Sequence, residues 1–510
     1  MSKVKKLLAM LMAVVMTLGM SVTAFADIKD EATITVVDEE GTSLDLYAED
    51  TNEDGVNLSY AKIIVPDRKT TTGWAFVGNT SSDDSKDLTI TKAFIEAFTT
   101  ESSRPTDQNV IETLINTTTD NNNIATSNTT QIADALSKVA ASDITFTTAE
   151  TNPFTVNNAG VYLIKASQEG YTYNTMAAYV GFGKVTIENP DGEDITYEYP
   201  SLVDVEITAK RVPETVTKST TDGDKLTSVD SIVTYTIEAY VPFIDPNDDN
   251  KYFGITDSIY GAEYYLTGAD SVAKVEMAGA TEPVANAEDF VVVDGSFDID
   301  LSDLITADNA NAGKKITVTY TAKVTGETVR NTSASHVGNA NHDSNPVEVY
   351  TGRIVLTKTD EADQNKKLAG AGFEVRKDNV DGTLLTFTEL GDGDYVYDAE
   401  GTVTEVFTGS AGTLTVRGLD VGTYYFKEKT APEGYHTANN LQGYDASATI
   451  SVEGETATGI IEKLTGLTNT KLSSLPSTGG IGTTIFTIGG CLIMIVAAGL
   501  FFATRRKAEK

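Results

Sequence analysis

The sequence predicts a mostly β protein in which immunoglobulin-like β-sandwich domains follow one another along the chain. Short runs of alternating valine, isoleucine, threonine and tyrosine recur, for example at 34–36, 233–237 and 316–320, with Asp-Gly or Asn-rich turns between them. This pattern is typical of antiparallel sandwiches. Helical patterns are short, at 88–98 and 132–141. Residues 99–130 are rich in Asn, Thr and Ser and are expected to form a long exposed loop.

Residues 1–26 have the three parts of a secretory signal peptide. Three lysines in the first six residues precede an apolar stretch, which ends in Ala-Phe-Ala at 24–26. An N-terminal membrane helix is the weaker reading, because the run is short and ends in small residues. The only cysteine, Cys491, lies in a second apolar run near the C-terminus, so the exported chain without its ends has no disulfide available.

The composition is strongly acidic, with 74 Asp and Glu against 38 Lys and Arg and a formal net charge of −36 at pH 7. Such a surplus argues against nucleic acid or anionic membrane as a partner and suits a well-solvated extracellular surface. The length that remains after removal of the two ends suits about three domains, each with its own core. We place them at 27–210, 211–350 and 351–472.

The C-terminal segment 475–510 combines a short motif with a membrane anchor. An apolar run at 481–503 is long enough to span a bilayer, and the basic residues after it would stay on the cytoplasmic side. A bare anchor needs no L-P-x-T-G motif before it. Here the whole segment resembles the cell-wall sorting signal of Gram-positive surface proteins. The resemblance implies that sortase cleaves after Thr478 and passes this residue to an amine; the motif comprises Leu475, Pro476, Ser477, Thr478 and Gly479.

Strand alternation predicts three polar side chains in the core of the third domain. Lys358 shares a face with Ile354 and Leu356, because residues two apart in a strand point the same way. By the same argument Glu428 and Asn469 face an apolar interior. Buried Lys and Glu become neutral, so the amine is a nucleophile and the carboxylic acid can polarise the Asn amide. The three groups could form a Lys–Asn isopeptide bond with loss of ammonia.

The third domain resembles the collagen-adhesin B-type (Cna-B) domain. The resemblance rests on the L-T-K-T-D opening, the L-A-G-A-G-F-E-V stretch, the Y-x-F-x-E…A-P-x-G-Y box and the closing L-T-N-T-K. It implies a bond between Lys358 and Asn469, promoted by Glu428. By the chain-entropy model, closing a loop of this size is worth about 4 to 5 kcal/mol.

The middle domain repeats this logic with looser motifs. Alternation places Lys218, Asp257 and Asn331 toward a core. The stretches around 228–242 and 255–259, with R-N-T-S-A-S-H-V-G-N at the end, resemble the middle (Cna-A-like) isopeptide domain of Gram-positive backbone pilins. The resemblance implies a Lys218–Asn331 bond with Asp257 as the acid. Asn339 is a competing acceptor.

One further lysine, Lys210, is expected to face outward. Val205, Ile207 and Ala209 alternate with it, so its side chain lies on the opposite face of the strand. In backbone pilins, a lysine at this junction lies in a Tyr-Pro-Lys-type motif and accepts the sortase-bound Thr of the next subunit. Here the local sequence is T-A-K-R. Lys210 is therefore the predicted intermolecular lysine, and an ordinary surface lysine is the alternative.

Hydrolase and metal signatures are missing from the sequence. None of the three histidines, His336, His342 and His436, lies in an H-E-x-x-H motif, and there is no G-x-S-x-G. Residues 50–61 open like a calcium loop but end in Ala61 in place of Glu, which favours a polar turn. We therefore expect no metal, no cofactor and no enzyme activity beyond single-turnover bond formation.

The resemblance covers nearly the whole chain and implies a sortase-assembled backbone pilin. The expected function is structural, as the shaft subunit of a covalent pilus that is exported, anchored to peptidoglycan and able to contribute to adhesion. The expected partners are a sortase, identical subunits, peptidoglycan and a host or microbial surface ligand. The alternative is a monomeric wall-anchored adhesin, which would keep the sorting signal but lack an accepting lysine.

Overall fold

The computed structural model describes residues 29–48, 54–82, 87–116, 129–187, 195–244, 248, 250–306, 308–438, 442–472 and 482–507. The chain divides into two compact units. The first contains the residues up to Thr221 together with Ile232–Lys323 and Arg330–Glu348, and the second contains Asp222–Ser231, Val324–Val329 and the residues from Val349 onward. The predicted signal peptide at 1–26 and positions 50–53 of the calcium-like loop lie outside the described residues.

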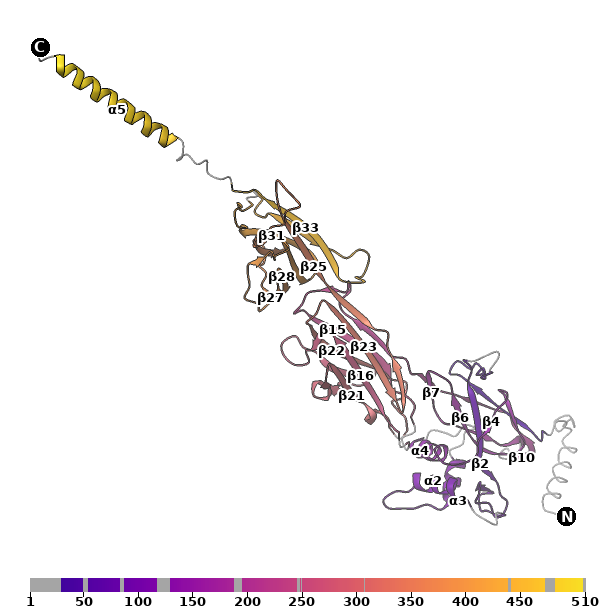
Figure 1. Ribbon diagram of the computed structural model, residues 1–510. Coiled ribbons are helices and arrows are strands. Elements are labelled where there is room, and N and C mark those ends of the chain that lie inside the picture. The colour runs from indigo at the N-terminus through magenta and orange to yellow at the C-terminus, as the bar shows by residue number, and fades with distance from the viewer. Residues whose placement is uncertain are drawn as a thin grey trace, which may run out of the picture. The chain divides into compact units, whose positions relative to one another are not determined.

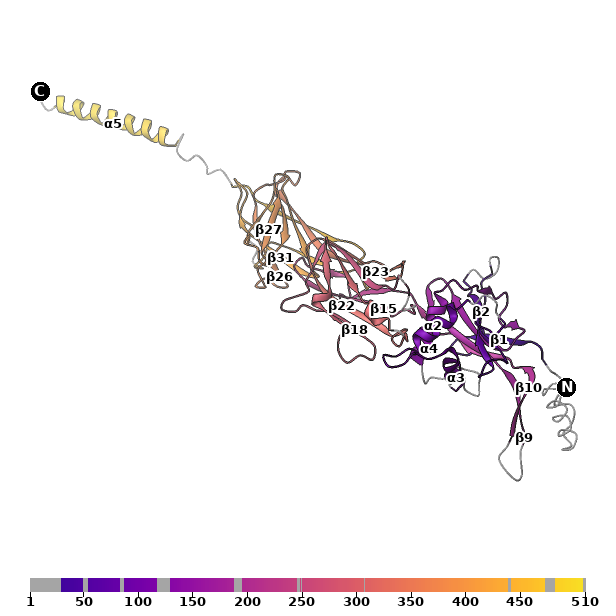
Figure 2. The same cartoon turned by 90° about the horizontal axis from the view of Figure 1, so that it is seen from below.

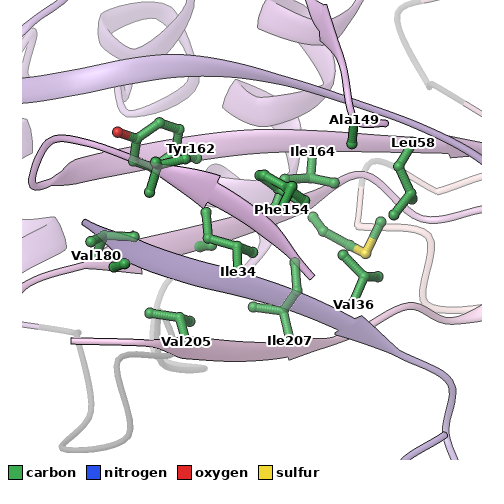
Figure 3. Close-up of a cluster of buried hydrophobic side chains, with 14 of the residues drawn as sticks. Ile34, Val36, Leu58, Ala149, Phe154, Tyr162, Ile164, Val180, Val205 and Ile207 are labelled. Atoms are coloured by element: carbon green, nitrogen blue, oxygen red, sulfur yellow. The ribbon is translucent and has the colours of Figure 1, made fainter. Parts of the chain in front are cut away.

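The first unit begins with a small sheet around β1 (Ala32–Val37). This strand pairs in parallel with β11 (Val205–Thr208) and antiparallel with β5 (Phe154–Val156). Ile34 and Val36 are fully buried, as expected for alternate residues of a half-buried strand. Figure 3 shows both residues in one apolar cluster with Phe154 and Ile207.

A second sheet separates two apolar cores. Its order is β3 (Trp74–Phe76), β2 (Asn57–Pro66), β6 (Gly160–Ser167) and β8 (Met176–Val180), with β4 (Thr147–Thr148) paired to β2. Along β6, Tyr162 and Ile164 join the cluster of β1, whereas Val161 and Leu163 face the other core. The helices α2 (Thr89–Ala97), α3 (Asp107–Asn116) and α4 (Thr129–Ala140) cover that second face.

The helices at 88–98 and 132–141 were predicted, but the expectation of a long exposed loop at 99–130 is wrong where α3 lies. Val110 and Ile111 of this helix are buried against the sheet, together with Leu114. These positions recur one and four residues apart, which is the spacing of one helix face. The Asn- and Thr-rich composition on both sides masks this short apolar stripe. Residues 117–128 lie outside the described part of the chain.

Two small ribbons complete this part of the first unit. β7 (Tyr171–Tyr173) pairs with β12 (Arg211–Pro213), and β9 (Phe182–Ile187) pairs with β10 (Ile195–Leu202). Figure 2 shows β9 and β10 running side by side, away from β1 and β2.

The remainder of the first unit is a two-sheet sandwich. One sheet has the order β13 (Thr217–Thr220), β15 (Ile232–Tyr240), β22 (Lys315–Val324), β18 (Ala273–Met277) and β19 (Ala285–Asn286), with β17 (Ala262–Tyr264) beside β22. The other contains β20 (Val291–Val293), β21 (Ser296–Asp300), β16 (Phe253–Tyr260), β23 (Thr328–Val337) and β24 (Ala340–Asp343). The short 3-10 turns Ala287–Asp289 and Ser302–Leu304 lie between these strands. The sheets meet where the rings of Tyr320 and Phe297 cross edge to face, 5.0 Å apart.

The second unit holds another sandwich (Figure 1). One sheet has the order β33 (Ile461–Asn469), β25 (Val347–Asp360), β30 (Thr413–Leu419), β28 (Asp394–Tyr397) and β27 (Phe387–Gly391), and β14 (Leu226–Thr227) also pairs with β25. The facing sheet is β29 (Val406–Phe407), β26 (Gly372–Lys377), β31 (Gly422–Thr430) and β32 (Ala446–Ile450). Ile354, Leu356, Phe373 and Phe426 are fully buried between the two sheets.

The last element is the helix α5 (Gly482–Lys507). Its segment Ile485–Arg505 has 21 residues and a mean hydropathy of 2.5, and it is long and apolar enough to cross a membrane. The fold prediction, tandem β-sandwiches followed by an apolar C-terminal helix, is confirmed.

Candidate functional site

The first candidate site, called the Lys358 site, lies between β25, β31 and β33 of the second unit. Lys358 on β25 is 0% exposed, Asn469 on β33 is 2% exposed and Glu428 on β31 is 5% exposed. β25 and β33 run in parallel, and the register pairs Asp360 with Asn469. The strand alternation that buries Ile354 and Leu356 also carries the lysine side chain inside.

These three side chains contact one another directly. The Lys358 Nζ donates a hydrogen bond to Asn469 Oδ1 and lies 3.2 Å from Glu428 Oε1. The Asn469 Nδ2 donates to the same Glu428 oxygen at 2.9 Å. A single carboxyl oxygen therefore touches both the amine and the amide nitrogen, which is where a group that moves a proton between them must lie.

The surroundings of the Lys358 site fix the carboxyl group and favour a neutral amine. The Glu428 backbone N–H donates to Asp445 Oδ2 at 2.8 Å, and the Ala438 N–H donates to Glu428 Oε2. The ring of Phe373 lies 5.8 Å from Lys358 Nζ. Burial lowers the pKa of Lys358 from 10.5 to about 8, although the nearby Glu428 opposes this shift.

The second candidate site, called the Lys218 site, lies in the sandwich of the first unit. Lys218 belongs to β13, Asp257 to β16 and Asn331 to β23. The side chains of Lys218 and Asp257 are 0% exposed, and Asn331 is also fully buried. The competing acceptor, Asn339, is exposed in the turn between β23 and β24, outside this core.

A tyrosine joins the three predicted groups. The Lys218 Nζ donates to Asp257 Oδ2 and, at 2.7 Å, to the Tyr320 hydroxyl. The Tyr320 hydroxyl donates to Asp257 Oδ1 at 2.8 Å, and Asn331 Nδ2 donates to the Tyr320 hydroxyl oxygen at 2.7 Å. A second tyrosine, Tyr264, donates to Asp257 Oδ1 at 2.8 Å.

The electrostatics of the Lys218 site favour the neutral forms of both ionisable partners. Burial lowers the pKa of Lys218, and the Asp257 charge opposes that effect. Burial also raises the pKa of Asp257, against the opposing effects of Lys218 and the two tyrosine hydroxyls. A neutral amine beside a protonated acid is the pair that amide exchange requires.

Sequence reasoning missed the two tyrosines. Tyr320 shares the parity of Ile316 and Val318 on β22, all three of which are fully buried, so the alternation of this strand already contained the signal. Tyr264 lies on the three-residue strand β17, which is too short for any parity argument.

Lys210 lies between β11 and β12, exposed, next to the buried Ala209. Its backbone N–H donates to Asn174 Oδ1 at 2.8 Å, and its carbonyl oxygen accepts from the Asn174 N–H at 3.1 Å. A groove of about 720 Å³ passes beside the lysine. The larger aliphatic and phenylalanine side chains of its lining are Ile132, Leu136, Met176, Ile207, Phe243 and Ile244. The sorting motif, Leu475 to Gly479, lies outside the described residues.

Comparisons with known proteins agree with the β fold and with the predicted wall anchor at the C-terminus. Residues 352–458 match the SpaA family, a prealbumin-like fold domain, and residues 468–510 match the LPXTG cell wall anchor motif. The chain is similar to the trypsin-resistant surface T6 protein of Streptococcus pyogenes serotype M6, at 23% identity over 450 residues, which covers 70% of this chain and 81% of that protein.

Two solved structures are similar to the chain at low identity. One is the full-length major pilin SpaD of Corynebacterium diphtheriae, with 16% identity, a TM-score of 0.44 and coverage of 88% of this chain and 99% of that one. The other is the T6 backbone pilin of serotype M6 Streptococcus pyogenes, with 15% identity, a TM-score of 0.48 and coverage of 87% and 98%.

The match to the LPXTG anchor motif, together with the apolar helix α5, defines the class of this chain as a surface protein that is anchored to the cell wall. The apolar helix α5 holds the chain in the membrane until the anchor motif is cut.

Proposed function

We propose that the chain is the shaft subunit of a pilus in which identical copies are joined head to tail by covalent bonds. The observation that carries the proposal is that one chain has both an LPXTG anchor motif and an exposed lysine between β11 and β12. Thr478 in the anchor motif is the acyl donor, and the exposed Lys210 is the acceptor amine. The similarity to the T6 protein, whose structure is described as a backbone pilin, supports this role.

The joining reaction exchanges one amide bond for another. Sortase breaks the Thr478–Gly479 peptide bond and holds the Thr478 carbonyl as an acyl-enzyme. The Lys210 Nζ of the next subunit attacks that carbonyl, and the enzyme is released. An amine of peptidoglycan ends the chain in the same way and fixes the polymer to the wall. The groove beside Lys210 offers apolar surface for the approaching motif.

In this proposal, the Lys358 site and the Lys218 site each form one isopeptide bond inside the subunit. At the Lys358 site, the neutral amine attacks Cγ of Asn469, a new C–N bond forms, and the amide nitrogen leaves as ammonia. Glu428 moves the proton between the two nitrogens. Lys218, Asp257 and Asn331 act in the same way in the middle domain. Each bond forms once per molecule, so the protein acts as a structural subunit and not as an enzyme with turnover. Its domains in this proposal are 27–210, 211–350 and 351–472.

Anchoring and joining are tested together by Thr478→Ala. Alanine keeps the backbone carbonyl but removes the threonine side chain from the L-P-x-T-G motif, so we expect that sortase no longer recognises the site and forms no acyl-enzyme. We expect wall extracts of the wild type, boiled in detergent, to give a ladder of high-mass bands on an immunoblot. The variant should give a single band in the membrane or the medium. A single wall-linked band in the wild type would favour the monomeric adhesin, and unchanged wall attachment of the variant would contradict the sorting reaction.

The Lys358 site predicts a pH dependence in a variant that cannot form its bond. In Asn469→Ala, Lys358 remains a buried amine whose pKa burial lowers from 10.5 to about 8. Between these values the unfolded chain binds a proton that the folded chain does not, so stability rises with pH. This contribution is present above pH 10.5 and is lost as the pH falls through 8.

The measurement is the melting temperature of the mature chain at pH 7 and at pH 9.5. The variant should gain more stability than the wild type over this interval, because the wild-type nitrogen is an amide that does not titrate. All other lysines are common to both proteins, so the wild type is the matched control. Equal changes in the two proteins would contradict the prediction.

A further inference from the structure

The two candidate sites differ in how the acid reaches the asparagine. In the Lys358 site, Glu428 Oε1 contacts both the amine, at 3.2 Å, and the amide nitrogen, at 2.9 Å. In the Lys218 site, Asp257 contacts the lysine, whereas the hydrogen bond to the asparagine comes from a tyrosine. Within the described residues, the Tyr320 hydroxyl is the hydrogen-bond partner of the Asn331 side chain.

We propose that Tyr320 is a catalytic residue of the Lys218 site, a proton relay that connects Asp257 to the leaving nitrogen of Asn331. This inference rests on the proposed Lys218–Asn331 bond. The hydroxyl lies 2.7 Å from Lys218 Nζ, 2.8 Å from Asp257 Oδ1 and 2.7 Å from Asn331 Nδ2. It therefore touches the attacking nitrogen, the acid and the leaving nitrogen at once.

The proton balance of the step requires such a relay. When Lys218 Nζ attacks Cγ of Asn331, it must lose one proton, and Nδ2 must gain one to leave as ammonia. The lysine passes its proton to Asp257 Oδ2, with which it is in contact. Asp257 starts as the protonated acid and gives its proton from Oδ1 to the Tyr320 oxygen, while the tyrosine gives its own proton to Nδ2. Both hydrogen bonds of the hydroxyl, to Oδ1 and to Nδ2, reverse direction in this step. Acid and tyrosine end unchanged, one C–N bond has formed and one has broken.

The surroundings of Tyr320 favour a neutral hydroxyl that relays protons over a deprotonated, charged phenolate. Tyr320 is fully buried, and its ring stacks 5.7 Å from Tyr235 and crosses Phe297 at 5.0 Å. Burial, together with the nearby Asp257, raises the pKa of Tyr320 well above its ordinary value. The hydroxyl therefore stays protonated, and it can accept one proton only while it passes another on.

The test is Tyr320→Phe in the full mature chain, followed by intact mass over time after synthesis. Phenylalanine keeps the ring packing and removes only the hydroxyl. We expect the wild type to lose two ammonia molecules, about 17 Da each, and the variant to lose one promptly. The loss at the Lys218 site should slow by about 100-fold or more, the usual contribution of a general acid–base group.

The experiment on Tyr320→Phe has a control variant, an internal reference and an alternative substitution. Tyr235→Phe removes a neighbouring buried hydroxyl and should keep both losses at the wild-type rate. The ammonia loss at the Lys358 site occurs in the same molecule and reports on correct folding of the second unit. Should Tyr320→Phe not fold, a fluorinated tyrosine at position 320 keeps the ring and the hydroxyl while changing its proton affinity, and the rate of the Lys218 loss should shift.

The outcomes separate the relay from the proposed function. A folded Tyr320→Phe variant that loses both ammonia molecules at the wild-type rate overturns the relay, as does an unchanged rate with fluorotyrosine. A wild type that loses ammonia only at the Lys358 site, mapped by peptides, removes the proposed middle bond and the relay with it. A slow loss restricted to Tyr320→Phe supports both.

Discussion

Replacing Glu428 with alanine is expected to leave one bond unmade and to lower the free energy of unfolding by about 4 to 5 kcal/mol in the chain-entropy model. Lys358 and Asn469 are separated by 111 residues, so their bond closes a long loop in the unfolded chain. The carboxyl oxygen that contacts both the amine and the leaving nitrogen is then gone, so the proton loses its path between them. Intact mass should show one ammonia, about 17 Da, retained.

The matched control for this experiment is Glu433→Ala. Glu433 is exposed five residues further along the chain and has no part in the site, so its variant should keep the wild-type mass and stability. Glu428→Gln is the second arm, because it keeps the shape of the side chain and removes the acid. A Glu428→Gln protein that still loses the full complement of ammonia would refute the role given to Glu428. Such a result would leave the fold untouched.

Lys210→Arg should abolish the pilus ladder while the monomer stays folded and wall-anchored. Arginine keeps the positive charge and similar length, but its guanidinium remains protonated and is not a nucleophile at neutral pH. Lys210 is exposed, whereas Lys218 and Lys358 lie inside their sandwiches, so an enzyme can reach the first and not the other two. Immunoblots of boiled wall extracts measure the ladder, and intact mass shows that the internal losses of ammonia persist.

Lys251→Arg is the matched control, since Lys251 is an exposed lysine in the same unit. Its ladder should equal that of the wild type. A ladder that survives in Lys210→Arg, with Thr478 mapped to another lysine, would keep the polymer and move the acceptor. If no lysine carries Thr478 in the wild type, the monomeric adhesin is the better description.

Strand parity carried most of the sequence-based prediction, because burial in a sandwich repeats every second residue. It placed Lys358, Glu428 and Asn469 in one core, and the structure buries all three. The contribution of Tyr320 could not be found in this way. Its hydroxyl meets Lys218 across a sequence separation of 102 residues, and the packing of one sheet on the other decides that contact. The alternation of a strand predicts on which face of the sheet a side chain lies, but not which side chain it contacts there.

The helix α3 escaped prediction for a different physical reason. Only Val110, Ile111 and Leu114 mark its apolar face, and the surrounding Asn and Thr residues have low helical propensity. Such a short helix has little stability of its own, and packing against the sheet of β2 and β6 supplies what propensity does not. Composition alone therefore predicted a loop where tertiary contacts produce a helix.

The parallel pairing of β25 with β33 has a mechanical consequence. A pull on the chain enters this sandwich through β25 and leaves it after β33, and Lys358 and Asn469 lie near the exit ends of these two strands. Once the two side chains are joined, force passes through the new amide, and the residues between them carry no load. At about 3.5 Å per extended residue, some 380 Å of chain cannot be drawn out. A fibre of such subunits would keep its length under drag instead of yielding one domain at a time.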